Sequence, residues 1–255
     1  MSNNLAGIKV EIVLPNYNSE LYLEETIHSV IKQTFKNWKL TIIDGNSNIE
    51  TQKILNQYNK HKKINVIKLK KKKKAGFCRN LAIKKSRSDY IAFIDSDDIW
   101  TSKKLSEQLN FMLKNKYHFT YTNYMQFISG IKKKLKVIKP AKFFDYEMFT
   151  KNTSIATSSM IIKRTLIGKT RFTNTKICED YFFKCKILKK IKYAYCLSKN
   201  LMKYRIRENS LQSNKMRNIY WIWYINRKYN KMDIFQNLQS IFLISINSIK
   251  KYGIK

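Results

Sequence analysis

The stretch YIAFIDSDDIW, at residues 90–100, decides the fold that we predict for this chain. Its first five residues are aromatic or apolar, which is typical of a strand buried on both faces. The run ends in residues 95–98, where three carboxylates in four positions repel one another unless they share a positive charge. Because Mg²⁺ and Mn²⁺ prefer oxygen ligands of this kind, the stretch predicts a strand that ends in a metal-binding turn. The alternative is an acidic turn that caps a helix beginning near Thr101.

The rest of the first half repeats this arrangement of strand, polar loop and helix. Strand-like runs at 8–14, 38–43, 64–69 and 90–94 alternate with helical patterns at 20–34, 50–60 and 76–85. Such alternation predicts an α/β fold with a mainly parallel sheet and right-handed crossovers. Loops that follow parallel strands meet at one edge of the sheet, where ligands bind. We therefore expect the polar loops 16–19, 44–47 and 95–98 to be neighbours.

The second half is less regular. After a helix to about residue 116, we expect a hairpin of 117–127 and 131–138 that turns at Ser129 and Gly130. A short helix at 143–151, a strand at 158–163, a helix at 178–190 and short strands at 193–197 and 201–205 would follow. The predicted domain spans 1–213, with a nucleotide-binding half at about 8–116 and an acceptor half at 117–213, and a helical tail spans 214–255.

The formal net charge of +34 raises the question of a polyanionic partner. We predict no nucleic-acid partner, because Lys greatly outnumbers Arg and the charge is spread along the chain. The lysines at 70–74 are expected to form a solvated loop. The chain shows neither an apolar run near twenty residues nor a charged-then-apolar leader, so we expect a cytoplasmic protein without a spanning helix. The four cysteines have no metal-ligand spacing and are expected to be free thiols.

Four segments together carry a family resemblance. They are VEIVLPNYN at 10–18, SVIKQTFKNWKLTIIDGNSN at 29–48, GFCRNLAIKKSRSDYIAFIDSDDIW at 76–100 and CEDYFF at 178–183. In this order and at these spacings, the chain resembles the family 2 glycosyltransferases over roughly residues 8–213. The resemblance implies a GT-A fold, a nucleotide-sugar donor and a role in bacterial surface-polysaccharide synthesis. No Gln-x-x-Arg-Trp motif follows Glu179 and Asp180, which argues against a processive synthase.

The resemblance also implies roles for individual residues. Those that would contact the nucleotide-sugar are Pro15, Asn16, Tyr17, Asn18, Asp44, Gly76, Arg79, Asn80, Asp95, Ser96 and Arg207. Asp95 and Asp97 match the DxD pair that would hold Mg²⁺ or Mn²⁺, and Asp98 matches a third acid. Asp180, with Glu179 beside it, matches the catalytic base of an inverting transfer. From the residues alone, this acidic pair could equally interact with the positive end of its own helix.

Two positions depart from the family pattern. Gly45 stands where a second Asp is common, and Arg207 stands where His is frequent. Arginine cannot ligate a cation, although it can bind a diphosphate directly as a fixed positive charge. Arg207 therefore raises the question of how strongly the enzyme depends on a metal.

The tail is rich in aromatic and basic residues at 219–227, is apolar on most turns of 234–249, and ends in Lys250, Lys251 and Lys255. This composition suits either a membrane interface or packing on the domain, including a homodimer. The sequence therefore predicts a glycosyltransferase at the inner face of the cytoplasmic membrane, in contact with anionic lipid, that acts on a lipid-linked glycan of lipopolysaccharide, O-antigen or capsule. Two alternatives are a nucleotidyltransferase, although its usual Gly-rich loop is absent from PNYNSE at 15–20, and a non-enzymatic protein that binds nucleic acid or anionic lipid.

Overall fold

The computed structural model describes residues 5–130, 136–207 and 214–252. The strands are β1 Val10–Asn16, β2 Trp38–Asp44, β3 Ile64–Lys68, β4 Tyr90–Phe93, β5 Ile99–Trp100, β6 Phe119–Phe127, β7 Val137–Ile138, β8 Phe143–Phe144, β9 Ile161–Lys163 and β10 Ala194–Arg205. The helices are α1 Leu23–Ile31, α2 Ile49–Gln57, α3 Ala75–Lys85, α4 Lys104–Lys114, α5 Tyr146–Lys151, α6 Arg164–Ile167, α7 Glu179–Leu188, α8 Lys215–Lys228 and α9 Ile234–Tyr252. A 3₁₀ turn, η1, spans Thr157–Ser159.

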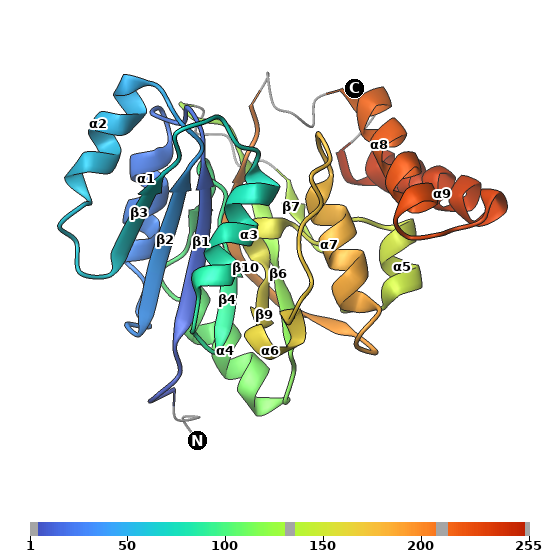
Figure 1. The fold of residues 1–255 in the computed structure, drawn as a ribbon. Coiled ribbons are helices and arrows are strands. Elements are labelled where there is room, and N and C mark those ends of the chain that lie inside the picture. The colour runs from blue at the N-terminus through green and yellow to red at the C-terminus, as the bar shows by residue number, and fades with distance from the viewer. Residues whose placement is uncertain (1–4, 131–135, 208–213, 253–255) are drawn as a thin grey trace.

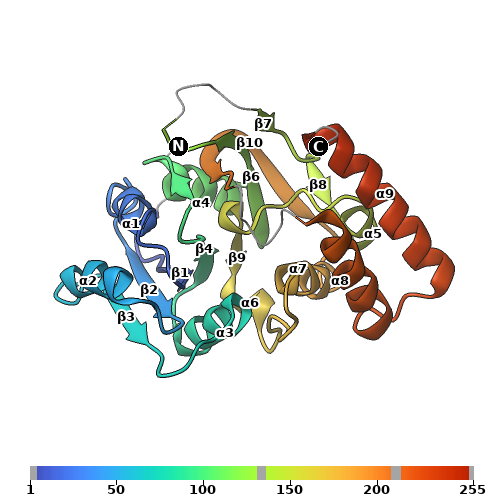
Figure 2. The ribbon, with the colours of Figure 1, turned by 90° about the horizontal axis from the view of Figure 1, so that it is seen from above.

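Within the described residues the strands form a single mixed sheet of ten strands in the order β3-β2-β1-β4-β9-β6-β10-β5, with β7 beside β6 and β8 beside β10. Helices α1 and α4 cover one face, and α3, α6 and α7 cover the other (Figures 1 and 2). Each face has its own apolar core. This arrangement confirms the predicted α/β class.

The parallel half of the sheet brings the polar loops together as expected. Strand β1 pairs in parallel with both β2 and β4, and Asn16 is level with Asp44 at the ends of their strands. The backbone N–H of Gly45 donates to the carbonyl of Asn16 at 2.8 Å, so the loops after β1 and β2 are joined directly. The carboxyl edge of the sheet is therefore lined by the predicted loops.

The second half differs from the prediction in several elements. Strand β10 is continuous from Ala194 to Arg205, because pairing with β6 absorbs the polar residues 198–200 as irregularities in register. Phe143 and Phe144 form a strand beside β10, and the helix begins only after Asp145, whose side chain accepts a hydrogen bond from the backbone N–H of Met148. The strand expected at 158–163 is shortened to β9 because η1 precedes it. In the hairpin β7 pairs with β6, and residues 131–135 of its predicted second strand lie outside the described residues.

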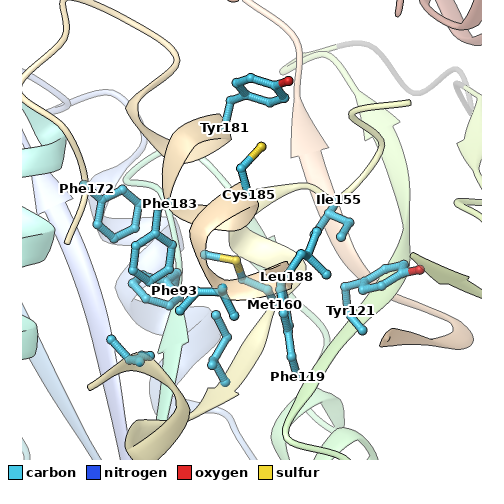
Figure 3. Close-up of a cluster of buried hydrophobic side chains, with 14 of the residues drawn as sticks. Phe93, Phe119, Tyr121, Ile155, Met160, Phe172, Tyr181, Phe183, Cys185 and Leu188 are labelled. Atoms are coloured by element: carbon cyan, nitrogen blue, oxygen red, sulfur yellow. The ribbon is translucent and has the colours of Figure 1, made fainter. Parts of the chain in front are cut away.

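Three phenylalanines connect strand β4 of the sheet to helix α7. Phe93 of β4 lies with its ring centroid 5.7 Å from that of Phe172 and 5.9 Å from that of Phe183, both in T-shaped contacts. Phe172 and Phe183 are stacked at 4.0 Å (Figure 3). Aromatic pairs of this geometry contribute beyond the apolar area that they bury. The stack fixes α7, and with it the acidic residues of its first turn, on the central strand β4.

We expect Phe93→Ala to lower the free energy of unfolding by about 3–5 kcal/mol, because it leaves a cavity among well-packed rings. Phe93 has no exposed surface, whereas Phe235 is 84% exposed, so Phe235→Ala is a matched control expected to stay within about 0.5 kcal/mol. Equilibrium unfolding in urea measures both changes. Equal losses in the two variants would contradict the role of the stack.

Candidate active site

The loops after β1 and β2 are tied to each other by side chains. The Asn16 amide donates to Asp44 Oδ1 at 2.7 Å and to Ser47 Oγ at 3.3 Å. Asn18, with a φ of 45°, directs its own N–H to Ser47 Oγ at 2.9 Å and accepts at its Oδ1 from the N–H of Asn48. Asparagine tolerates this left-handed conformation better than most residues. The two predicted donor loops thus form one rigid unit.

Asp44 is the centre of this unit. Its carboxylate is completely buried and accepts hydrogen bonds from Asn16, from the backbone and hydroxyl of Ser47, and from Gln52 Nε2 at 2.6 Å. Both of its oxygens are therefore engaged by protein donors. A contact from Asp44 to a nucleotide would require one of these bonds to be exchanged.

Gly45 has a steric reason to be glycine. A Cβ at this position would lie 2.8 Å from the carbonyl oxygen of Lys73 and 3.3 Å from that of Asn16. The lysine run at 70–74 is exposed, as predicted, but its backbone passes against the donor loops. The Nζ of Lys72 lies 4.2 Å from the centroid of the Tyr17 ring. The run therefore borders residues that are predicted to contact the nucleotide-sugar.

The acidic turn after β4 divides into two parts. Asp95 and Asp97 are partly exposed, and each gives one oxygen to an arginine: Asp95 Oδ1 to Arg79 at 2.6 Å, and Asp97 Oδ2 to Arg207 at 2.8 Å. Asp98 instead points inward, where its Oδ1 accepts from the backbone N–H of Arg205 at 3.2 Å. Burial raises the pKa of Asp98 well above its usual value. Asp98 is thus a structural acid rather than a surface ligand.

Arg79 connects the acidic turn to helix α7. Its side chain is buried, and its second terminal nitrogen donates to Glu179 Oε1 at 2.7 Å. Gly76, one turn earlier on α3, allows the close approach: a Cβ there would lie 2.8 Å from Glu179 Cγ and 2.9 Å from the carbonyl of Thr173. Two carboxylates from distant segments therefore share one guanidinium.

Asp180 follows Glu179 and has its own cation. Its Oδ2 accepts from Lys184 Nζ at 2.7 Å and from Thr157 Oγ1 at 2.8 Å, and Lys184 also donates to the carbonyl of Ile155. Desolvation by itself would raise the pKa of Asp180, but the ammonium of Lys184 and these hydrogen bonds hold the pKa below its usual value. Asp180 is consequently ionised throughout the neutral range.

The remaining predicted residues have the following surroundings. Asn80 uses its amide on the backbone of Phe172, donating to the carbonyl at 2.9 Å and accepting from the N–H at 2.8 Å. Pro15 is buried within β1, and Ser96 is half-buried in the acidic turn. In this structure Asn80 therefore positions the polypeptide around Phe172, and its amide is not directed to open space.

Several residues at the site were not identified from the sequence. Thr157 and Ser158 of η1 bond Asp180 and the backbone N–H of Asp95 respectively. Arg205 donates to the carbonyl of Asp97 at 2.8 Å and pairs with Glu25 at 2.5 Å. The spacing of four between Asp180 and Lys184 is a helix-pair signal that could have identified the lysine. Thr157 and Ser158 carry no such local signal, because their partners are distant in sequence.

The donor set of the acidic turn fits a hard divalent cation. Over residues 5–130, 136–207 and 214–252 no group of three or more His, Cys, Asp and Glu side chains is placed to hold a metal ion. Asp95 and Asp97 still provide carboxylate oxygens on one turn. Because Mg²⁺ is usually bound by one or two carboxylates together with substrate phosphates, two acids are sufficient when a diphosphate completes the ligands.

Comparison of the sequence with known proteins gives a consistent result. Residues 11–182 match the model of a family described as glycosyl transferase family 2. Over 243 residues the chain is 31% identical to TuaG of Bacillus subtilis, named as a teichuronic acid biosynthesis glycosyltransferase, covering 95% of this chain and 96% of the relative. It is 33% identical over 219 residues to WfgD of Escherichia coli, a UDP-Glc:α-D-GlcNAc-diphosphoundecaprenol β-1,3-glucosyltransferase, covering 84% of this chain and 83% of the relative.

Solved structures share the fold. TarS of S. aureus in complex with UDP-GlcNAc superposes with a TM-score of 0.73 at 18% identity, covering 95% of this chain and 73% of TarS. The mannosyltransferase PcManGT of Pyrobaculum calidifontis, in complex with GDP-Man and Mn²⁺, gives 0.69 at 11% identity, covering 97% of this chain and 76% of that enzyme. These similarities confirm the predicted GT-A fold.

We expect Arg79→Met to destabilise the protein by about 3–5 kcal/mol, because it leaves two partly buried carboxylates without their shared cation. A surface pair provides the control: Lys199 contacts Glu107 at 2.6 Å with the lysine largely exposed, so Lys199→Met should cost about 0–1 kcal/mol. Urea unfolding at neutral pH measures both variants. A loss for Arg79→Met no larger than that of the control would show that Arg79 does not hold the site together.

Proposed function

Because the chain belongs to glycosyl transferase family 2 and is a glycosyltransferase, we propose that it moves one sugar from a nucleotide-sugar to a hydroxyl of a lipid-linked glycan, with inversion at the anomeric carbon. The observation that carries this proposal is the Arg79 bridge between Asp95 and Glu179. This bridge sets the acidic turn beside the first turn of α7. Acids that could bind a metal at the leaving diphosphate and an acid that could accept the proton of the attacking hydroxyl therefore border one site. The family assignment favours this reaction over nucleotidyl transfer and over non-enzymatic binding.

The donor would lie at the carboxyl edge of the sheet. Tyr17 would flank the base, and the unit built on Asn16, Asn18 and Asp44 would contact the ribose and base. Complexes of the structurally similar TarS with UDP and UDP-GlcNAc support a nucleotide-sugar in this fold. The lysines beside Tyr17 would add positive charge near the diphosphate.

Asp95 and Asp97 would hold Mg²⁺ or Mn²⁺, as the Mn²⁺ complex of PcManGT supports. When bound, the ion supplies Lewis-acid stabilisation of the departing nucleoside diphosphate. Arg207, which contacts Asp97, would add a fixed positive charge beside the same phosphates. Glu179, held by Arg79, would fix the position of the α7 first turn.

Asp180 would act as the general base. The acceptor oxygen attacks the anomeric carbon, the bond from that carbon to the diphosphate oxygen breaks, and the hydroxyl proton passes to Asp180. Lys184 and Thr157 orient one carboxylate oxygen and keep the group ionised before attack. A base with a lowered pKa takes the proton late, when bond formation has made the hydroxyl acidic.

The acceptor is proposed from the relatives. The name of WfgD specifies a GlcNAc-diphosphoundecaprenol acceptor, and TuaG is named for teichuronic acid synthesis. A lipid-linked glycan of lipopolysaccharide, O-antigen or capsule assembly, met at the inner face of the cytoplasmic membrane, suits this group of enzymes. In the part of the chain that the structure describes, no helix has the length and apolarity needed to cross a membrane.

Asp97→Asn and Asp180→Asn should affect different steps. Asp97→Asn is expected to weaken Mn²⁺-dependent binding of nucleoside diphosphate, because it removes a ligand charge. Asp180→Asn should bind the nucleotide normally, but its turnover should be about 10²–10⁴-fold slower, because that is the usual contribution of a general base. Thermal shift with a panel of nucleotides and a transfer assay with the responding nucleotide-sugar measure these effects. Glu50→Gln, on exposed α2, is the control, and unchanged turnover in both variants would refute the site.

Replacing Arg207 by His tests its effect on the metal. We expect Arg207→His to bind Mn²⁺ about tenfold more tightly, because it removes the cation paired with Asp97 and introduces an imidazole that can ligate. Electron paramagnetic resonance of free Mn²⁺ measures the affinity without any turnover. Arg207→Met separates the two causes, since it removes the charge without adding a ligand. Wild-type affinity in both variants would show that Arg207 does not limit metal binding.

A further inference from the structure

Helix α9 presents an apolar stripe to solvent. Phe235, Leu238 and Phe242 are 84%, 52% and 65% exposed, and Ile249 continues the stripe one heptad after Phe242. On α8, Met216 and Tyr220 are also exposed. The two helices form the end of the molecule opposite α2 (Figures 1 and 2). Residues 234–249 carry no charged side chain, although one residue in five of the whole chain is Lys or Arg.

The inner face of α9 is partly polar. Asn237 and Ser240 are buried, and both accept from the amide of Asn226 on α8, at 3.0 and 3.1 Å. The Ser240 hydroxyl donates to the carbonyl of Thr150 at 2.6 Å, and the Asn247 amide donates to the carbonyl of Lys151 at 3.0 Å. These bonds provide donors for the carbonyls of the last two residues of α5. They also fix which face of α9 points toward α5 and α8.

Ile244, which is 8% exposed, and Ile241 also pack on the core from this inner face, so α9 carries apolar side chains on two faces. An ordinary surface helix instead directs a single apolar stripe to the core and its polar side chains to water. Rotating α9 by half a turn would bury the phenylalanines but would break the bonds of Asn237, Ser240 and Asn247. A buried polar group that loses its partner costs about 1–3 kcal/mol. The stripe is therefore held outward by specific bonds, and a contiguous exposed apolar surface of this kind marks an interaction site.

The charges around the stripe select its partner. Exposed basic residues lie at both ends of the uncharged segment: Arg227, Lys228 and Lys231 before it, and Lys250 after it. Asp233 is the one acidic residue in the sequence from 214 to 255. A second copy of the chain would bring the same cations, and another net charge of +34, against this surface. An anionic lipid surface would instead attract each cation by about 1 kcal/mol.

We propose that the outer face of α9, formed by Phe235, Leu238, Phe242 and Ile249, docks on an anionic lipid bilayer with the helix in the plane of the interface. The apolar side chains enter the boundary between head groups and acyl chains, while the flanking lysines and Arg227 remain among the head groups. This surface gives a structural basis to the membrane contact included in the proposed function.

The docking surface is connected to the catalytic helix. Tyr181 of α7 donates from its hydroxyl to Asn226 Oδ1 of α8 at 2.8 Å, and Phe182 contacts Tyr229 with centroids 5.2 Å apart. A bilayer bound by α9 is thereby kept on the side of the molecule that carries α7. The functional value of this connection between α9 and α7 rests on the proposed function, because it matters only if Asp180 acts on a lipid-linked acceptor.

Vesicle flotation of the full chain tests the docking surface. Wild-type protein should float with vesicles containing phosphatidylglycerol, and much less with phosphatidylcholine alone. Phe235→Gln, Leu238→Gln and Phe242→Gln together should reduce binding at least tenfold, while Gln preserves helix propensity. Leu21→Gln is the control, because Leu21 is 80% exposed and lies beside α1 at the other end of the sheet.

Three results would overturn the proposal: no flotation of the wild type, equal flotation of the triple variant, or a wild-type dimer in lipid-free sedimentation that the triple variant abolishes. The last would assign the face to a second copy. Unchanged thermal stability of the triple variant excludes misfolding as the cause of lost binding. Asp97→Asn should float like the wild type, so failure of the donor-site assignment would leave this result intact.

Discussion

Arg79 fixes the separation between the two acidic parts of the site. Its guanidinium is planar and presents its donors in a rigid fork, so two different terminal nitrogens hold Asp95 and Glu179 in a fixed relative geometry. Because it is buried, its ion pairs are little screened by water or salt. Asp95 and Glu179 lie 84 residues apart in the sequence, 16 and 100 residues after Arg79, yet this one side chain contacts both carboxylates. The geometry of the site therefore depends on a single rigid group rather than on flexible loops.

The same arginine joins the polar site to the apolar core. Its guanidinium carbon lies 5.3 Å from the centroid of the Phe172 ring, which stacks on Phe183 of α7 and contacts Phe93 of β4. Asn80, one residue after Arg79, forms two hydrogen bonds with the backbone of Phe172. Packing and electrostatics thus act on the same residues.

The parallel half of the fold could be predicted because its signals are local: an apolar strand, a polar loop and a helical period repeat in order. Continuous β10 could not, since Ser198, Lys199 and Asn200 read as a turn until β6 pairs across them. The sequence also shows that α9 has two faces but not which one meets the core, because hydrogen bonds from α5 and α8 decide it. Likewise the convergence of the donor loops follows from topology, whereas the buried network of Asp44 depends on contacts that only the folded chain makes.

The contact between Gly45 and the carbonyl of Lys73 has a kinetic consequence. It anchors the backbone of the lysine run beside the loops after β1 and β2. The five ammonium groups of residues 70–74 are therefore kept near these loops. If the proposed donor site is correct, charges in this position would act on a dianionic nucleotide-sugar before any hydrogen bond forms, within a Debye length of about 8 Å at physiological ionic strength. They would accelerate the encounter with the nucleotide-sugar more than they would prolong its residence on the protein. The run would therefore select ligands by charge at a distance, and salt would weaken that selection without changing the shape of the site.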